Sequence, residues 1–358
     1  MLRWIFAAVI GLFTVAAPAA DYLLVASRPN QLHLIDAAAR RVVKTIDIPG
    51  DGLPSTLSIA RDGKVAYVLT NRGESVSGIE LESGKEVFRA DFSHGNLRVK
   101  DMFGMTVSED GQYLYAHLLP VRLLVDRYEA LDTQFAVYRT ADGIGAKPLR
   151  TIPAPRRISM LLPGTSNDHF VAMGWDFYVI DAQNGGIRKT LPLRNWQRTG
   201  VGEPDVLAFW PQFEQARMMS TPYGAAMTGV DPKSPEAMKT GIITFDLDSQ
   251  TVGAYEFENA TRALFSSVVS PTNRNHVFAV MNQLVRIDLA EKRVVHTGTV
   301  KQTFYAINIS SDGREVYLGG ALDTIAVHDT TTLQQIGEIN IPGGTDQGTS
   351  SLRVIRRE

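Results

Sequence analysis

Apolar and polar residues alternate with a period of two along most of this chain. The runs Leu32–Asp36 and Val42–Asp47 are typical, and such alternation places successive side chains on opposite faces of a β-strand. After the first 20 residues, no segment carries the i, i+3, i+4, i+7 apolar stripe of an amphipathic helix. Clusters of turn residues separate the runs at the spacing of antiparallel sheets. The pattern therefore predicts an all-β protein.

A turn containing Asp-Gly returns between pairs of these runs. It occurs at Asp62, Asp110 and Asp312, each with a serine shortly before it and a glycine directly after it, and Ser270–Asn273 is a looser copy. Neighbouring copies lie roughly 40 to 60 residues apart, which is the length of one four-stranded β-propeller blade. A repeat of this kind determines architecture and says little about chemistry, so function must be sought where the copies deviate.

Seven runs fit the third strand of such a blade, and five of them end in an aspartate before a hairpin. The seven runs are Leu34–Asp36, Ile79–Leu81, Val137–Arg139, Val179–Asp181, Thr244–Asp246, Arg286–Asp288 and Val327–Asp329. An aspartate at this place can accept hydrogen bonds from the backbone of the following turn. The count predicts a seven-bladed β-propeller with four antiparallel strands in each blade.

The two ends of the chain complete one blade between them. Ser351–Arg356 reads as a lone strand, whereas Tyr22–Ala26, Leu32–Ile35 and Val42–Ile48 are three strands that lack a first partner. Joined, they form a four-stranded blade that closes the ring and protects sheet edges from aggregation. We therefore expect residues 21–358 to form a single propeller domain.

The first 20 residues have a different composition. A positive Arg3 precedes the apolar run Trp4–Val15, and Ala17–Ala19 provides small residues on both sides of a proline. This order is typical of a secretory signal peptide, cut near Ala19 or Ala20. The alternative is a membrane anchor, but the run is shorter than the roughly 20 residues that span a bilayer. We expect export to the periplasm.

The composition excludes several classes of function. A formal net charge of −2 and a pI near 6.4 argue against a nucleic-acid surface, which needs a basic stripe. The absence of cysteine removes disulfides, thiol nucleophiles and covalently attached c-type haem from this polypeptide. The seven histidines show no metal-ligand spacing on one element, although a ring could join histidines from different blades. No hydrolase Gly-x-Ser-x-Gly motif is present. We assign no catalytic, cofactor-binding or metal-ligating residue to this chain.

Two segments, Leu118–Gln134 and Thr221–Lys239, are too long for an ordinary blade. Long connections on a rigid ring are where partner contacts usually lie. An arginine and several aromatic residues stand in or near them, and both residue types are enriched in interface cores. We predict four residues as subunit contacts or as the wall of a pocket: Arg122, Phe209, Trp210 and Tyr223. The alternative for Phe209 and Trp210 is the core of a blade.

Six phrases go beyond a generic propeller. They are Arg98–Gly104, Pro120–Leu123, Pro204–Trp210, Thr221–Tyr223, Thr240–Asp246 and Leu318–Leu322. In this order, on a chain of this length with an export signal, they resemble the β subunit of quinohemoprotein amine dehydrogenase. The resemblance covers essentially the whole mature chain and includes both long segments.

The resemblance implies a periplasmic complex of three different subunits. In that family the α subunit carries two c-type haems, the small γ subunit carries a cysteine tryptophylquinone, and the propeller β subunit holds no covalent cofactor. The complex oxidises primary amines to aldehydes and ammonia and passes electrons through the haems to a soluble cytochrome or blue-copper protein. The propeller would hold the γ subunit against the α subunit and wall the substrate pocket, and the isolated chain would be inactive.

Three alternatives remain open at this point. A stand-alone periplasmic scaffold or binding propeller, of the repeat type found in bacterial surface proteins, would share the Asp-Gly turns but is not expected to share the two long segments. A propeller hydrolase such as a lactonase would need carboxylates or metal ligands at the ring axis. The large subunit of methylamine dehydrogenase is also a seven-bladed periplasmic propeller beside a quinone-bearing small subunit.

Overall fold

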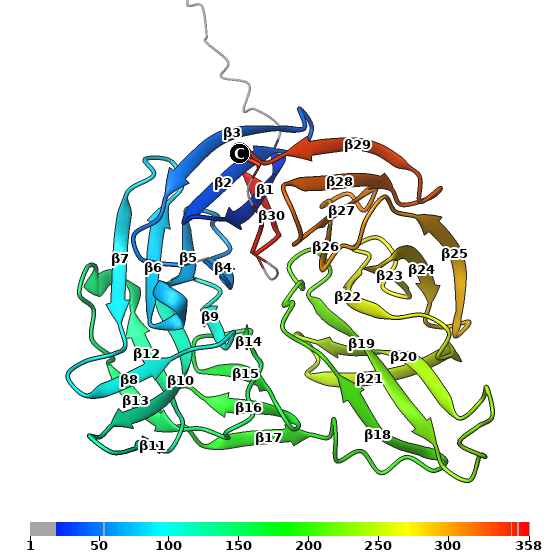
Figure 1. Ribbon diagram of the computed structural model, residues 1–358, viewed down its shortest axis with the longest axis horizontal. Coiled ribbons are helices and arrows are strands. Elements are labelled where there is room, and N and C mark those ends of the chain that lie inside the picture. Colours follow the sequence, from blue (N-terminus) through cyan, green and yellow to red (C-terminus); the bar gives the residue numbers. More distant parts are fainter. Residues whose placement is uncertain (1–18, 53, 345, 349–350, 358) are drawn as a thin grey trace, which may run out of the picture.

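The computed structural model describes residues 19–52, 54–344, 346–348 and 351–357. These residues form seven antiparallel sheets arranged as a ring around a central axis, as Figure 1 shows. The predicted all-β, seven-bladed propeller is therefore confirmed. The predicted signal peptide, residues 1–20, lies outside the described residues apart from its last two positions. Over the ranges given above, no helix is long and apolar enough to cross a membrane.

The first four blades follow one another around the ring. Blade 1 consists of β30 (Arg353–Arg357), β1 (Ala20–Ser27), β2 (Gln31–Asp36) and β3 (Arg41–Asp47). Blade 2 consists of β4 (Leu57–Ile59), β5 (Val65–Thr70), β6 (Ser75–Glu80) and β7 (Glu86–Asp91). Blade 3 consists of β9 (Met105–Val107), β10 (Tyr113–Leu123), β12 (Gln134–Arg139) and β13 (Arg150–Pro153). Blade 4 consists of β14 (Met160–Pro163), β15 (His169–Met173), β16 (Phe177–Asp181) and β17 (Ile187–Leu191).

The remaining three blades complete the circle. Blade 5 consists of β18 (Val201–Val206), β19 (Met218–Met227), β20 (Met238–Asp246) and β21 (Thr251–Asn259). Blade 6 consists of β22 (Leu264–Val269), β23 (His276–Met281), β24 (Gln283–Asp288) and β25 (Arg293–Thr299). Blade 7 consists of β26 (Ala306–Ile309), β27 (Glu315–Gly319), β28 (Thr324–Asp329) and β29 (Gln335–Asn340). Two 3-10 helices, η1 (Asn71–Gly73) and η2 (Thr140–Asp142), lie within the described residues.

The turn chemistry that the sequence predicts is present in every copy. Each of the seven predicted third strands is the third strand of its blade. The five aspartates that end such strands all accept backbone hydrogen bonds from the next turn, as Asp329 does from Thr331 and Thr332 at 3.0 and 2.7 Å. In the Asp-Gly turns the glycines take left-handed backbone angles, with φ of +63° at Gly63 and +74° at Gly313, which other residues adopt only with strain.

The ring closes through the two ends of the chain, as predicted. β30 pairs antiparallel with β1, with Ile355 opposite Tyr22. The hydroxyl of Ser351 accepts a hydrogen bond from the backbone N–H of Ala26 at 3.1 Å. The last strand of the chain, β30, is thus the inner strand of the blade that also contains the first strand, β1. Pairing between the two ends of the chain closes the ring.

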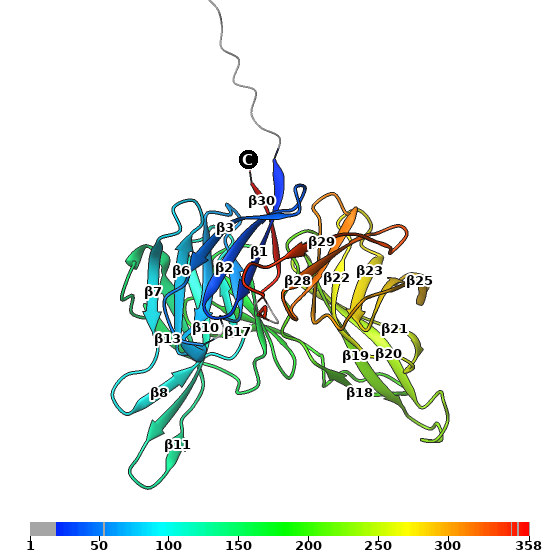
Figure 2. The ribbon, with the colours of Figure 1, turned by 45° about the horizontal axis from the view of Figure 1, so that its top comes forward.

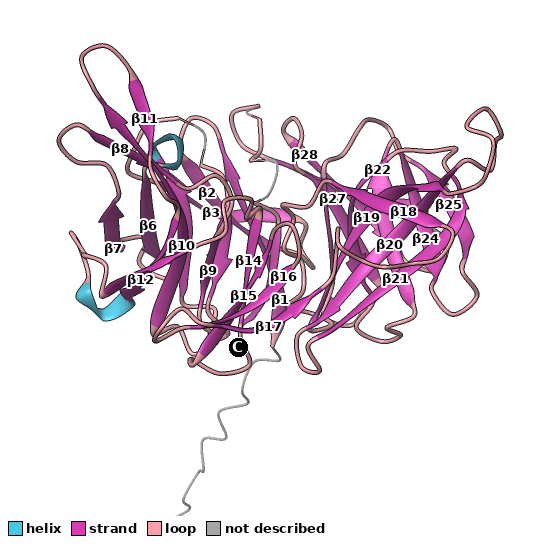
Figure 3. Ribbon diagram, turned by 90° about the horizontal axis from the view of Figure 1, so that it is seen from below, coloured by secondary structure: helices cyan, strands magenta, loops and turns pink. Residues whose placement is uncertain are grey.

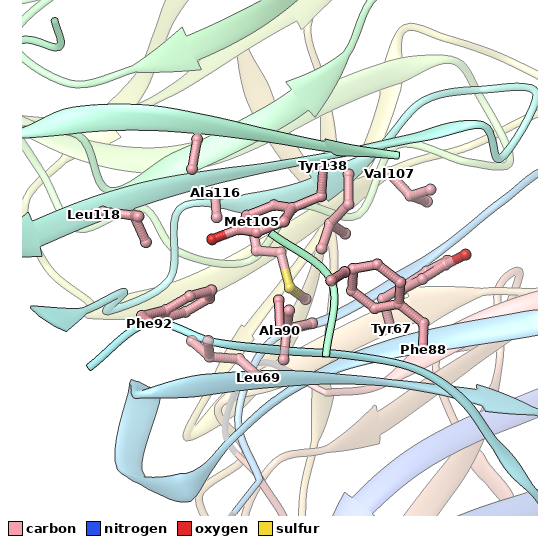
Figure 4. Packing of buried hydrophobic residues seen from close by; sticks show 14 of the residues in the cluster. Tyr67, Leu69, Phe88, Ala90, Phe92, Met105, Val107, Ala116, Leu118 and Tyr138 are labelled. Carbon is pink, nitrogen blue, oxygen red and sulfur yellow. The ribbon is translucent and has the colours of Figure 1, made fainter. Parts of the chain in front are cut away.

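The hydrophobic core lies between neighbouring blades rather than in one central mass. Figure 4 shows the layer between blades 2 and 3, where Tyr67 and Phe88 of one sheet face Met105 and Tyr138 of the next. The ring of Phe88 meets the rings of Tyr67 and Tyr138 edge-on, at 5.7 and 6.3 Å between centroids. Edge-to-face pairs of this kind each contribute about 0.5–1.5 kcal/mol beyond their buried area, and similar clusters fill the other spaces between blades.

Both long segments project from the same face of the ring. Residues 118–134 extend β10 and add β11 (Tyr128–Ala130), and β10 also pairs with β8 (Leu97–Lys100). We call this three-stranded extension the ribbon. Residues 221–239 lengthen the β19–β20 hairpin. Figure 2 shows both extensions running downward from the disc, and Figure 3 shows the ribbon and the C-terminus on opposite sides. We refer to this side as the ribbon face.

Candidate functional site

Blade 5 departs from the architecture of the other blades at the ring axis. The inner strands of neighbouring blades contact one another, as β4 does β9 and β22 does β26, but in blade 5 it is β19 that lies against β22. Strand β18 pairs only with the C-terminal half of β19, at Tyr223–Met227. The chain between these two strands, residues 207–217, forms no strand and contacts several other blades. We call residues 207–217 the axial segment.

The centre of the axial segment is buried against the far side of the ring. Trp210 is only 4% exposed and packs in one cluster with Leu352 and Val354 of the C-terminal region and with Ala306 and Tyr317 of blade 7. These residues come from the two blades that meet where the ring closes. Trp210 therefore packs across the ring axis and connects blade 5 to blades 7 and 1.

Polar contacts fix the same segment to β30. Arg353, which is 2% exposed, forms an ion pair with Glu214 at 2.5 Å and donates a hydrogen bond to the carbonyl of Pro211. The side-chain amide of Gln215 donates to the carbonyl of Val354 at 3.1 Å. Burial lowers the pKa of Arg353, and the Glu214 carboxylate opposes that shift, so the guanidinium remains charged.

A row of five aromatic rings runs across the ribbon-face mouth of the axis. Phe209 stacks on Trp210 at 3.9 Å and on Phe103 at 4.8 Å. Trp210 lies 6.1 Å from Phe265, which lies 5.1 Å from Tyr305. Phe103, Phe265 and Tyr305 stand at or just before the first strands of blades 3, 6 and 7, so the chain brings them to the same face. We call these five residues the aromatic platform.

Exposed apolar side chains surround the platform. Met102 directly precedes Phe103, and Leu207 lies two residues before Phe209. Leu322 lies in the β27–β28 hairpin on the same face. Each of the three is more than half exposed. Four of the platform rings are themselves only partly buried. Exposed apolar side chains gathered on one face are typical of interaction sites.

The structure places the four predicted contact residues in three different settings. Arg122 lies on the ribbon and forms an ion pair with Glu129 at 2.8 Å, both side chains being largely exposed. Phe209 belongs to the platform and is partly exposed, whereas Trp210 beneath it is buried. The contact role of these residues stays a prediction. The alternative for Trp210 was a place in the core, and Trp210 is indeed buried in a hydrophobic cluster of this chain.

Tyr223 is buried inside blade 5. Its ring meets Trp196 edge-on at 5.3 Å, and its hydroxyl donates to Glu256, which also forms an ion pair with Arg198. Burial and, after it, the hydrogen bond to Glu256 raise the pKa of Tyr223. Gly241 on the next strand has no side chain, and an added Cβ would lie 2.3 Å from the Tyr223 ring. The phenol therefore locks the long hairpin to its neighbouring strands.

Sequence reasoning missed Phe103, Phe265 and Tyr305. A signal existed, because each stands at the start of the first strand of its blade, where side chains reach the axial mouth. Separated from one another by 40 residues or more, they form no local pattern.

A constellation suited to metal binding is absent from the described part of the ring. Within the described ranges, no three His, Asp or Glu side chains approach closely enough to hold a metal ion. Burial lowers the pKa of His33 and of His117 to about 4, so both are neutral near pH 7. The platform and the ribbon form the candidate functional surface of this chain.

The comparisons with known proteins concern the fold. No family profile matches this chain, and no curated protein matches its sequence. Among solved structures, a chain of hydrazine synthase from Kuenenia stuttgartiensis superposes with a TM-score of 0.58 at 12% identity, over 85% of this chain and 90% of that one. Apo AztD from Citrobacter koseri gives a TM-score of 0.53 at 12% identity, over 95% and 99%. At this identity the likeness shows the propeller fold alone.

Proposed function

We propose that this propeller is the β-type subunit of an exported quinohemoprotein amine dehydrogenase, and that its ribbon face holds a small quinone-bearing subunit against a dihaem subunit. In such a complex the quinone supplies the oxidation of a primary amine to an aldehyde and ammonia, and the haems carry the electrons away. This chain supplies shape, contact surface and a dry wall for the substrate pocket. The isolated chain is expected to be colourless and inactive.

One observation carries this proposal: several of the phrases that resemble the family contribute to one face. Arg98–Gly104 contains most of β8 of the ribbon and Phe103 of the platform. Pro204–Trp210 contains two platform rings, and Leu318–Leu322 ends at an exposed leucine of the same face. Residues that lie far apart in the sequence thus contribute to one apolar surface, as a partner contact would require.

Physical arguments favour a permanent partner on this surface. Aromatic side chains bury about 150–250 Å² each and dominate interface energies, and permanent interfaces commonly bury about 2,000 Å² or more. The rigid ribbon adds a second contact to the side of the platform. An apolar wall would exclude water from a neighbouring reaction and strengthen its electrostatics. That a chain of an enzyme, hydrazine synthase, has the same fold is compatible with a subunit role.

Native purification from the periplasm tests the proposal. Affinity-tagged chain should bring down two companions, with haem absorbance and amine-dependent reduction of a dye. A tagged chain that purifies as a monomer without haem would support the stand-alone scaffold, and amine turnover by the isolated chain would contradict the division of roles.

A pair of substitutions tests the surface itself. Leu207, beside the platform, is 53% exposed, and Ile187, on the outer strand of blade 4, is 51% exposed. Leu207→Asp should lower the recovery of the companions at least tenfold without changing the thermal midpoint of the isolated chain. Ile187→Asp introduces the same charge at equal exposure and should leave recovery unchanged. Equal recovery with both variants would remove the platform from the interface.

A further inference from the structure

A cavity of about 250 Å³ opens on the ribbon face between blade 4 and the axial segment. One wall comes from Arg157–Ser159, which lead into β14, and from the β15–β16 hairpin that carries Trp175. The opposite wall is the chain from Val206 to Phe209. Most of the lining is apolar, with Ile158, Met173, Leu193, Ala208 and Phe209 contributing. The lining residues, all of them described, include no carboxylate.

Trp175 organises the cationic side of this cavity. The guanidinium carbons of Arg157 and Arg194 lie over its ring, 5.0 and 5.6 Å from the centroid. The indole N–H donates to the side-chain carbonyl of Asn195 at 3.3 Å, and buried Asp176 accepts from the backbone N–H of Leu193 at 2.8 Å and binds the Asn195 amide. These hydrogen bonds attach the β15–β16 hairpin, which carries the indole, to the β17–β18 connection.

The guanidinium N–H groups of the two arginines differ in their hydrogen-bond partners. Arg194 donates to the carbonyls of Pro204 and Val206 at 3.1 and 3.4 Å, so its N–H groups are already bonded to the backbone of β18. Arg157 is exposed, and within the described residues its guanidinium has no hydrogen-bond or ion-pair partner beyond the Trp175 ring. A guanidinium over an aromatic face keeps the N–H groups in its own plane available.

We propose that this cavity binds a small carboxylate with an apolar body, such as an aliphatic or aromatic acid. The carboxylate pairs with Arg157, and the apolar part lies against Met173, Trp175 and Phe209. One free guanidinium matches the single charge and the paired oxygens of a carboxylate, whereas a phosphate dianion would need further donors. The volume is below the range typical of drug-sized ligands, which limits the ligand to a small acid. The cavity shares Leu207 and Phe209 with the proposed partner surface, but binding of a small acid to the isolated chain does not rest on the amine dehydrogenase proposal.

Calorimetric titration of the mature chain with 3-phenylpropionate tests this site. We expect saturable one-to-one binding at low salt, and no saturable binding of the neutral analogue 3-phenylpropionamide. Arg157→Gln should weaken the affinity at least tenfold. The matched control is Arg156→Gln, which removes the same charge from the adjacent exposed residue, whose guanidinium donates to the carbonyl of Leu131 at 3.2 Å. That variant should change the affinity less than twofold.

Each outcome decides the proposal. A loss confined to Arg157→Gln, with the thermal midpoint unchanged, supports the carboxylate site. Equal losses in both variants would mean diffuse attraction by surface charge, and equal binding of the acid and the amide would mean a purely apolar cavity. Either result, or the absence of binding to the wild-type chain at millimolar 3-phenylpropionate, overturns the proposal. None of these results bears on companion recovery, so the two proposals fail separately.

Discussion

Removing the Trp210 side chain should destabilise the whole ring. Trp210 is 4% exposed and packs on residues from blades 1 and 7, so Trp210→Ala leaves a cavity at the axis. Truncation of a buried tryptophan costs about 3–5 kcal/mol. Unfolding a ring of about 340 residues has an entropy near 0.7 kcal/mol per degree, at about 2.1 cal/mol/K per residue. The thermal midpoint should therefore fall by about 4–7 °C.

Differential scanning calorimetry at a fixed scan rate measures this fall. The matched control is Leu207→Ala, on the same axial segment but largely exposed, which should stay within about 0.5 kcal/mol of the wild type. If Trp210→Ala melts within about 1 °C of the wild type, Trp210 does not pack across the ring axis as described and the magnitude argument fails.

Two further predictions concern ring closure and pH. Deleting residues 350–358 removes β30, exposes the edge of β1 and leaves Glu214 without its arginine, so calorimetry should show a lower and broader transition; an unchanged midpoint would contradict closure. Burial raises the pKa of Asp101 to about 7, so between about pH 4 and pH 7 the folded protein binds a proton that the unfolded chain has released, and stability falls as the pH rises through this window. Asp101→Asn keeps the acceptor for the Gly104 N–H and should lose less stability between pH 5 and pH 8 than the wild type, as measured by urea unfolding; identical losses would contradict the assignment.

The blade pattern could be predicted from the sequence because it is local. Strand alternation, the Asp-Gly turns and the aspartates after third strands each act within a few residues. Asp246, for example, bonds the N–H groups of Asp248 and Ser249 at 2.9 and 3.0 Å. Closure could be predicted too, because strands without partners at the two ends have few ways to pair.

The axial segment could not be predicted in the same way. Its residues show neither alternation nor a turn motif, and what buries Trp210 is a contact with Leu352 and Val354, far away in the sequence. The predicted contact residues included two of the five platform rings, because Phe209 and Trp210 are adjacent aromatics near a long segment. Phe265 and Tyr305 could be added only once the ring placed their blades side by side.

The axial segment connects the platform to the strand that closes the ring. Phe209 and Trp210 belong to the platform, and the next few residues of the same segment bind Arg353 and Val354 of the closing strand. A partner that packs on Phe209 therefore also restrains the strand that latches the ring. Because ligands that bind only the folded state stabilise it, docking on the platform should hold the ring closed, and a loosened closing strand should weaken docking by the same free energy. An ordinary inner strand would contact only its two neighbouring blades, whereas the axial segment of blade 5 reaches the closing blade across the ring.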